Sequence, residues 1–309
     1  MPLSNILKKL EEERISLNEK RNKLLPLLFI PPIIGIFIGS NFPGPAFIFG
    51  IAVGTMLSFL IHFAVIGQAF KNIKAKLKSA LVGEFMQSYH PDIEFDYSMA
   101  KKDGRDIIKN SKLIGFNSST EEDVLQGKMK DSYFYISEMK LSRKSDDNDV
   151  TVFKGIIFEL NIPGKNFPQS EIQTNQSFWS KFTGQHKEHH EYNVYYGTED
   201  EREFEKKVGP LLPFIEHLNK ENKSIRIRAN GDSLIIMMEN KMRFMDEPRL
   251  STNKSFINQE YNTNLGKQLN TLLFIVESFV NEMGESEVLE KLELKALEIL
   301  KANNLDRKT

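Results

Sequence analysis

The chain has 309 residues, a formal net charge of −1 and no cysteine. This length fits an anchor plus one large or two small globular units, and the near-neutral charge gives no basic field that would attract nucleic acid. The absence of cysteine excludes disulfides, thiolate metal sites and cysteine nucleophiles. We therefore expect a folded protein that does not bind nucleic acid and is indifferent to the redox state of its compartment.

The first residues carry a heptad-like pattern. Four leucines recur at intervals of seven, with charged residues between them: Leu3, Leu10, Leu17 and Leu24. The pattern predicts an amphipathic helix over residues 3–25, so that residues 1–23 form an N-terminal segment of their own. Such a helix can pair in a coiled coil, lie on a membrane surface or pack against a soluble domain, and the sequence leaves these alternatives open.

A long uncharged segment follows. From Leu24 to Phe70 there is no Lys, Arg, Asp or Glu. Two apolar spans, about 24–40 and 46–67, flank a turn rich in glycine and proline, and about 20 helical residues cross the hydrocarbon core of a bilayer. The segment therefore predicts a transmembrane helical hairpin over residues 24–70.

Polar and small residues within this hairpin have two interpretations each. His62 is more readily a packing or hydrogen-bonding residue than a proton relay, because no carboxylate accompanies it. Glycines in the two spans either let the helices pack closely or reflect the general abundance of glycine in membrane helices. These glycines are Gly35, Gly39, Gly50 and Gly54.

Basic residues flank both spans. Three precede the first span, and Lys71, Lys74, Lys76 and Lys78 follow the second. The positive-inside rule then places both termini in the cytoplasm. Apolar residues at spacing four from Ile73 to Phe85 predict a juxtamembrane helix over residues 71–88 that ends before Pro91. Its four lysines are candidates for contact with lipid headgroups, although ordinary flanking charge also explains them.

Residues 89–283 show the pattern of a cytoplasmic α+β domain with a mainly antiparallel sheet. Alternation predicts strands at 131–141, 151–163 and 191–197, and a hairpin at 224–239 around Asn230-Gly231. Helical patterns occur at 199–223, 262–283 and 286–303, the last in a C-terminal segment over 284–309. Residues 163–191 show little periodicity, which predicts a long loop.

The chain offers few candidates for chemistry. It lacks the glycine-rich phosphate-binding motifs and the nucleophile and zinc motifs of common hydrolases. Clustered histidines in the expected loop, at positions 186, 189 and 190, are the one arrangement that resembles a metal site, since His186 and His190 would share a face of a helix. We interpret His186, His189 and His190 as solvated residues and expect no metal and no cofactor.

Two acidic stretches and one polar stretch remain. Carboxylates at Asp96, Asp103 and Asp106 and at residues 121–123 can perform acid–base chemistry only if burial raises their pKa values. We instead interpret residues 119–123 as the capped start of a helix. The polar stretch Tyr89, His90 and Asp92 is a further candidate, although the adjacent Pro91 also explains it as a helix end followed by a turn.

Several segments resemble those of a known family in the same order. They are SYHPDIEFD, SKLIGF, EEDVLQGKMKDSYFYISEMKL, VFKGIIFELNIP, YNVYYGTEDEREF and IRIRANGDSLIIMME. The chain resembles the bacterial domain-of-unknown-function family numbered 3137 over residues 5–283. This resemblance implies a multi-pass protein of the bacterial cytoplasmic membrane, but it assigns no reaction and no catalytic residues.

These observations lead to an expected function. A strong anchor and a well-patterned domain without a catalytic motif favour a non-enzymatic scaffold that binds a protein partner at the inner face of the lipid bilayer. A module for lipid headgroups or a small ligand is the alternative, and an enzyme with an unrecognised site is a third. Homo-oligomerisation is left open.

Overall fold

The computed structural model describes most of the chain. The described residues are 3–24, 26–40, 48, 52–56, 60, 66–98, 104–145, 148–174, 185–189, 192–196, 201–219, 222–240, 259–284, 286–288, 290–291 and 294. They fall into two compact units, which are described separately. The first comprises residues 1–84 and 247–258, and the second comprises residues 85–246 and 259–309.

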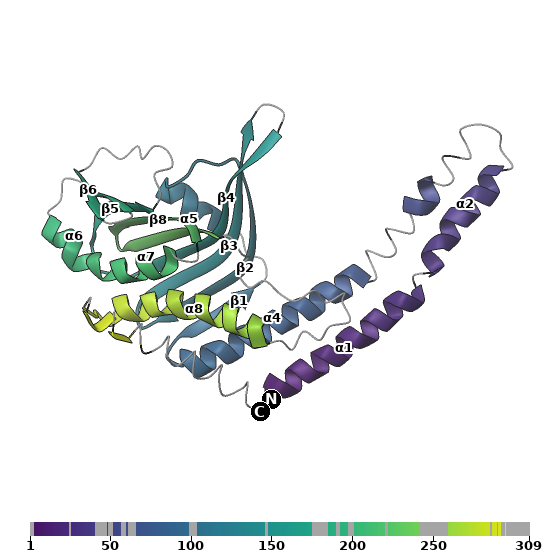
Figure 1. The fold of residues 1–309 in the computed structure, drawn as a ribbon, viewed down its shortest axis with the longest axis horizontal. Helices are drawn as coiled ribbons and strands as arrows, with labels where there is room; N and C mark the ends of the chain where they lie inside the picture. Colours follow the sequence, from purple (N-terminus) through teal and green to yellow (C-terminus); the bar gives the residue numbers. More distant parts are fainter. Residues whose placement is uncertain are drawn as a thin grey trace. The chain divides into compact units, whose positions relative to one another are not determined.

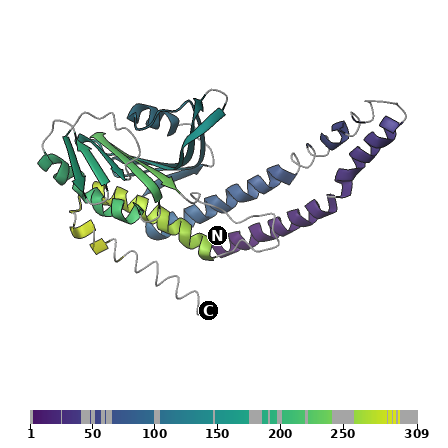
Figure 2. The same ribbon diagram turned by 45° about the horizontal axis from the view of Figure 1, so that its top comes forward.

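Helices make up the described part of the first unit. They are α1 (Leu3–Leu24), the 3₁₀ turn η1 (Pro26–Phe29), α2 (Ile30–Ser40) and most of α4 (Gln68–Tyr89), whose last residues belong to the second unit. α1 and α4 run side by side (Figures 1 and 2), and Lys76 Nζ of α4 lies 3.2 Å from Glu13 Oε2 of α1. The helices expected at 3–25 and 71–88 are thus present.

The buried face of α1 differs from the expected leucine stripe. Leu7, Leu10, Arg14 and Asn18 are the buried positions, while Leu17 is half-buried. The Arg14 guanidinium donates two hydrogen bonds to the carboxylate of Glu11, at 2.8 and 2.9 Å. The inward face follows the 3.6-residue period of a helix rather than the strict seven-residue repeat.

Within the described residues, no helix combines the length and the apolar character needed to cross a membrane. α2 has 11 residues, and much of the segment expected to form the second span lies outside the described part of the chain. The transmembrane hairpin expected over 24–70 is therefore not observed in the structure.

The second unit is built on one antiparallel sheet, which confirms the expected α+β class. Its nine strands lie in the order β1-β2-β3-β4-β9-β8-β5-β7-β6, and each strand is antiparallel to its neighbours. The strands are β1 (Glu94–Ser98), β2 (Ser118–Met129), β3 (Ser132–Ser145), β4 (Asn148–Asn161), β5 (Phe167–Thr174), β6 (Gln185–His189), β7 (Tyr192–Tyr196), β8 (Asn222–Gly231) and β9 (Ser233–Asn240).

Helices cover both faces of this sheet (Figures 1 and 2). One face packs under α7 (Leu212–Asn219) and α8 (Gln259–Val280), where Phe214 and Phe274 meet edge to face with ring centroids 5.5 Å apart. α5 (Gly104–Ser111) lies on the other face over a smaller cluster that includes Ile157 and Met237. α6 (Glu201–Lys207) and η3 (Gly209–Leu211) lead into α7, so Pro210 and Pro213 divide the expected helix.

The hairpin expected at Asn230-Gly231 is present. Gly231 takes φ +57°, a conformation that L-residues rarely adopt. On either side of this turn, Asn230 of β8 pairs with Ser233 of β9. The turn also holds the connection after β4, because the backbone N–H of Ile162 donates to the Asp232 carbonyl oxygen at 2.8 Å. The Asn-Gly pair therefore predicted the turn correctly, and this turn sets the register of β8 and β9.

Two expectations about local structure are wrong. Residues 119–123 begin no helix, because they lie in β2, where a bulge between Glu122 and Leu125 gives Asp123 a φ of +52°. The Tyr97 hydroxyl donates to Asp123 at 2.8 Å, so this buried carboxylate is held by the neighbouring strand. Residues 163–191 are not one long loop, because they contain β5 and β6, whose polar side chains hide the alternation.

Candidate functional site

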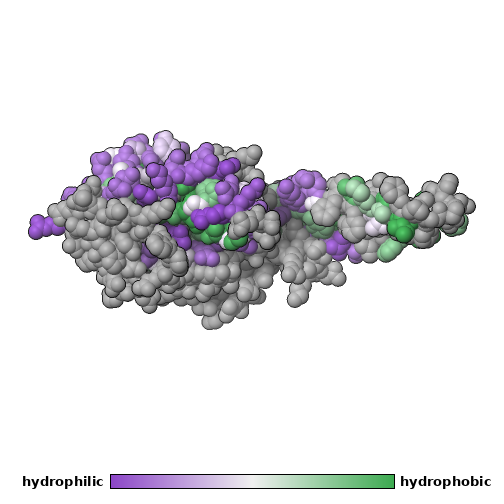
Figure 3. Space-filling model, turned by 90° about the horizontal axis from the view of Figure 1, so that it is seen from above, coloured by the Kyte–Doolittle hydropathy of each residue, from purple (hydrophilic) through white to green (hydrophobic). Residues whose placement is uncertain are grey.

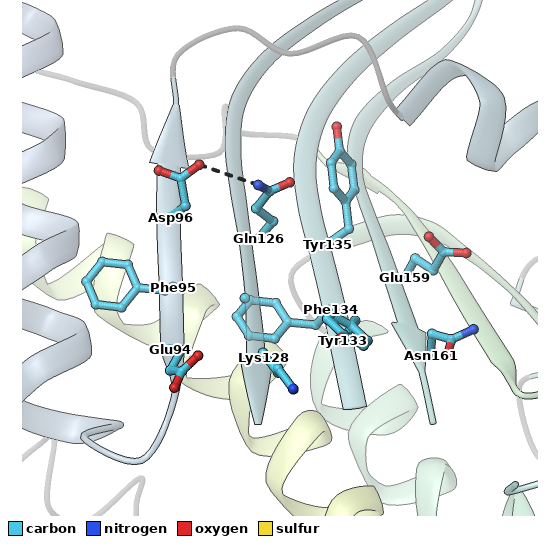
Figure 4. A pocket seen from close by; sticks show the side chains of 11 residues that line it. Glu94, Phe95, Asp96, Gln126, Lys128, Tyr133, Phe134, Tyr135, Glu159 and Asn161 are labelled. Carbon is cyan, nitrogen blue, oxygen red and sulfur yellow. Dashed lines mark hydrogen bonds between the residues drawn. The ribbon is translucent and has the colours of Figure 1, made fainter. Parts of the chain in front are cut away.

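A pocket with a volume of about 540 Å³ lies over the first four strands of the sheet (Figure 4). This volume falls within the range of pockets that hold small molecules. Each of the four strands contributes to it: Glu94, Phe95 and Asp96 from β1, Gln126, Gly127 and Lys128 from β2, Tyr133, Phe134 and Tyr135 from β3, and Glu159 and Asn161 from β4.

The strand register arranges the polar lining in two rows. Residues that face each other across antiparallel strands lie on the same face of the sheet, as do residues two positions apart. The first row is Glu94, Lys128, Tyr133 and Asn161; the second is Asp96, Gln126, Tyr135 and Glu159. Figure 4 shows the two rows beside each other, with Asp96 accepting a hydrogen bond of 3.4 Å from the Gln126 amide.

The two rows differ in charge. The first contains one carboxylate and one ammonium group in adjacent strands, at Glu94 and Lys128. Lys128 Nζ lies 5.4 Å from the centre of the Tyr133 ring, a distance typical of a cation–π contact. The second row contains two carboxylates, at Asp96 and Glu159, and no basic residue. The pocket is therefore acidic, and its negative charge is concentrated in the second row.

Glu159 is the half-buried carboxylate of that row. Burial raises the pKa of its side chain, and a hydrogen bond from the Ser233 hydroxyl at 3.3 Å lowers it in part. The half-buried carboxylate of Glu159 therefore accepts a hydrogen bond from the Ser233 hydroxyl. Among the described residues, no salt bridge joins Glu159 to a basic group.

Tyr135 connects α5 to the sheet through its hydroxyl group. Its hydroxyl donates to Glu121 and accepts the backbone N–H of Gly104, the first residue of α5, at 3.1 Å. Burial, together with the neighbouring Glu121 carboxylate, raises the pKa of Tyr135 far above its usual value. Glu121 also accepts from the Gly104 N–H at 3.2 Å, so a strand carboxylate caps the positive end of the helix.

Gly127 forms the floor of the pocket where β1 and β2 approach each other. A methyl group at this position would meet the Glu94 carbonyl oxygen at 2.4 Å and the Phe134 ring at 2.5 Å. Phe134 is paired with Gly127 across the strands, is buried, and contributes to the pocket lining beside the glycine. The ring covers the space that a side chain at residue 127 would otherwise fill.

Within the polar stretch at 89–92, the described side chains of His90 and Asp92 lie in different surroundings. α4 ends at Tyr89, and a turn at Pro91 follows, as the helix-end interpretation predicts. His90 is buried and its Nδ1 lies 2.6 Å from Glu277 Oε1 of α8, whereas Asp92 is exposed. His90 Nε2 has no hydrogen-bond partner within the described residues. The contact between His90 and Glu277 connects the segment after α4 to α8, and the His90 side chain is 0% exposed.

The lysines proposed for headgroup contact differ in their surroundings. Lys71 is exposed and Lys74 half-buried, while Lys76 is paired with Glu13. Lys78 is 2% exposed. These four side chains therefore do not form one exposed basic surface.

The histidine cluster lies partly outside the described residues, which end at His189 in this segment. His186 and His189 belong to strand β6, so the helical spacing that would bring positions 186 and 190 onto one face does not apply there. Across the described parts of the chain, no group of three or more potential ligands could hold a metal ion.

Sequence reasoning identified only part of the pocket. Of the candidate carboxylates, Asp96 lines the pocket and Glu121 caps α5, Asp106 is exposed on α5, and Asp103 lies outside the described residues. Glu159 was missed because it stands in a strand as one polar residue among apolar ones. The available signal was the carboxylate within the apolar run GIIFELNI, since a buried position rarely carries a charge.

Comparisons with known proteins give little further guidance. No family model matches the chain, and none of the curated proteins matches it. Among solved structures, the chain is similar to the crystal structure of the mycobacterial trehalose monomycolate transport factor A, TtfA. The TM-score is 0.31 with 11% sequence identity, and the match covers 62% of this chain and 90% of that chain. A likeness at this level carries no argument about function.

Proposed function

We propose that the chain is a membrane-anchored, non-enzymatic binding module. In this proposal residues 24–70 insert into a bilayer as a helical hairpin, and the sheet domain binds a partner or ligand on the cytoplasmic side. The proposal includes membership of the bacterial family numbered 3137 and a location in the bacterial cytoplasmic membrane with both termini inside.

The observation that carries the anchor is the exposure of apolar side chains. Ten of the fourteen exposed large hydrophobic side chains among the described residues lie between Phe29 and Leu60. Phe37 is 73% exposed and Phe29 is 64% exposed, and Figure 3 shows such apolar surface in green. Surface of this kind is unfavourable in water by roughly 25 cal/mol per Å² and is stable in lipid.

The small residues of this segment support a close approach of its two arms. Gly35 and Gly54 are buried, whereas Ile33, Ile34 and Ile36 beside Gly35 are exposed. Buried glycines with large apolar side chains facing outward are the arrangement expected of membrane helices that pack through small residues. The same segment contains no charged side chain, which a surface-exposed helix in water would need.

Cell fractionation tests the anchor. The full-length chain is expressed in bacteria, and the membranes are washed with high salt and then with alkaline carbonate. We expect the wild-type chain to stay in the membrane pellet through both washes. The variant Ile33→Lys with Phe37→Lys should leave the pellet, because each lysine at the centre of a helix costs about 2.5–3.5 kcal/mol on insertion scales.

The matched control for that experiment is Ile15→Lys, which replaces an exposed isoleucine of α1 outside the uncharged segment. It should remain in the pellet. Recovery of the wild-type chain in the soluble fraction would refute the anchor, and release by salt alone would show surface attachment instead of insertion.

The pocket supports the binding part of the proposal. It has the size of a ligand site, and its lining includes no nucleophile–base pair: Tyr135 is held by Glu121 and Gly104. Cross-linking in living cells followed by mass spectrometry tests for a protein partner. One dominant protein cross-linked to residues 89–283 supports a scaffold, and self-cross-links alone would oppose it.

A further inference from the structure

The helix pair of the first unit carries positive charge at one end. α1 runs towards the uncharged segment and α4 runs away from it, side by side (Figures 1 and 2), so the end of α1 and the start of α4 lie together. The last five residues of α1 include three basic residues and no acidic one. The four basic residues of α4 all precede its one acidic residue, Glu84. Basic side chains therefore stand on both sides of the segment proposed to insert.

Three lysines at this end are exposed. They are Lys20 and Lys23 of α1 and Lys71 of α4, which we call the basic collar. Within the part of the chain that the structure describes, no salt bridge and no side-chain hydrogen bond engages any of the three. The half-buried Arg21 and Lys74 add positive charge beside the collar.

Nearby carboxylates do not balance this charge. Glu19 is the acidic residue of α1 beside the collar, and it stands against the five basic residues of the collar and its neighbours. Farther from the uncharged segment, lysines of α4 have other surroundings: Lys76 Nζ lies 3.2 Å from Glu13 Oε2, and Lys78 is 2% exposed. The end of the helix pair that adjoins the uncharged segment therefore has an excess of positive charge.

The ion pair between Lys76 and Glu13 locates the collar along the two helices. With a rise of about 1.5 Å per residue, Lys71 lies about 7.5 Å from this pair, Lys20 about 10.5 Å and Lys23 about 15 Å, all towards the uncharged segment. The collar thus occupies a band about 8 Å deep. This depth is about one Debye length at physiological salt, so the three charges act together on an anionic surface.

Helix formation does not account for all of this charge. A basic residue in the last turn of α1, such as Lys23, is favourable at the negative end of the helix dipole. Lys71 lies near the start of α4, where a cation gains nothing from that dipole. Three exposed ammonium groups in one band also repel each other. An anionic partner would offset this repulsion.

The surface next to the collar indicates the kind of partner. The uncharged segment begins directly after Lys23 and ends directly before Lys71, and it carries exposed apolar side chains such as Phe29 and Phe37. Ammonium groups that border an apolar surface match a bilayer, whose hydrocarbon core is bordered by headgroups. Basic residues beside a membrane segment favour anionic headgroups, because the negative surface potential of the bilayer attracts them. A soluble acidic protein would match the charge but not the apolar border.

We propose that the basic collar binds the headgroups of anionic phospholipids at the cytoplasmic surface of the bilayer. This inference rests on the proposed function, because it names the lipid class that the anchored chain selects. The collar differs from the four lysines expected to contact headgroups, since α1 supplies two of its three members. Lys76 is paired with Glu13 and Lys78 is buried, so neither belongs to it.

Lipid selectivity in vesicles tests this proposal. The full-length chain is reconstituted in phosphatidylcholine vesicles that contain a trace of spin-labelled phosphatidylglycerol or of spin-labelled phosphatidylcholine. Electron spin resonance then gives the fraction of labelled lipid that the protein immobilises. We expect the association constant of phosphatidylglycerol to exceed that of phosphatidylcholine at least twofold. Raising the salt to about 1 M should reduce this preference, because salt screens exposed charges.

Substitution of the collar locates the site. The triple variant Lys20→Gln, Lys23→Gln and Lys71→Gln should associate equally with the two lipids. Because all three side chains are exposed, the variant should unfold at the same temperature as the wild type, which a circular dichroism melt checks. A triple variant that keeps the wild-type preference would refute the collar.

The matched control removes the same amount of charge elsewhere. It combines Lys8→Gln and Lys9→Gln, near the other end of α1, with Lys140→Gln in β3, and all three of these lysines are exposed. The control should keep the preference for phosphatidylglycerol. An equal loss of preference in both triple variants would show that net charge alone decides it, which would also refute a localised site.

The outcomes separate this inference from the proposed function. If the chain inserts into the vesicles but associates equally with both lipids, the collar is refuted and the anchor stands. If the chain does not insert, yet binds vesicles made with phosphatidylglycerol at low salt while the collar variant does not, the anchor is refuted and the collar stands. A chain that neither inserts nor binds such vesicles refutes both.

Discussion

The glycine at the floor of the pocket should tolerate no side chain. In Gly127→Ala the new methyl group would lie 2.4 Å from the Glu94 carbonyl oxygen and 2.5 Å from the Phe134 ring, while ordinary contacts begin at 3.4 Å. Both neighbours must therefore move by about 1 Å. Phe134 is buried and the Glu94 oxygen belongs to the backbone of β1, so neither can turn aside freely.

Overpacking of this kind costs about 1–3 kcal/mol. In a domain of this size each kcal/mol lowers the midpoint of thermal unfolding by about 2–4 °C, so we expect a decrease of about 2–12 °C for Gly127→Ala. The measurement is thermal and urea unfolding of the full-length chain in detergent, followed by circular dichroism.

The matched control is Gly83→Ala in α4, where an added methyl group has no neighbour within 4 Å. Alanine is the better helix former, so this variant should gain up to about 1 kcal/mol. Adding Phe134→Leu to Gly127→Ala should not restore stability, because the Glu94 oxygen remains in place. A Gly127→Ala chain as stable as the wild type would refute the close approach of β1 and β2.

Three further predictions concern buried groups. Burial raises the pKa of Glu159 in the folded chain, so stability falls as the pH rises from the usual value of 4.5 through that raised pKa. Glu159→Gln should therefore be more stable than the wild type in urea at pH 7.5, with the gain lost at pH 4, and an equal gain at both values would refute this. His90→Ala removes the 2.6 Å contact between His90 Nδ1 and Glu277 Oε1 and should cost about 1–3 kcal/mol in urea unfolding. An unchanged midpoint would contradict the contribution of this contact to stability. Phe274→Ala should lower the free energy of unfolding by about 3–5 kcal/mol. Because the Phe214 and Phe274 rings meet edge to face, a double-mutant cycle with Phe214→Ala should give a coupling energy of about 0.5–1.5 kcal/mol.

The sequence alone determined the features that depend on local pattern. Alternation located β3, β4, β7 and the β8–β9 hairpin, because residues that face a core on one side repeat with the period of a strand. The turn at Gly231 was readable because few residues adopt a positive φ. The uncharged segment at 24–70 was equally plain, and its assignment to a membrane stays a prediction.

Only the tertiary structure decided what depends on distant pairing. The stretch at 119–123 carries the composition of a helix start, yet it lies in β2, a bulged strand that pairs with β1 and β3. The pocket arises because the register places Asp96, Gln126, Tyr135 and Glu159 in one row, although they span more than sixty positions of the chain. Shifting one strand by a single residue would move its side chains to the opposite face, and sequence periodicity does not specify which strands become neighbours.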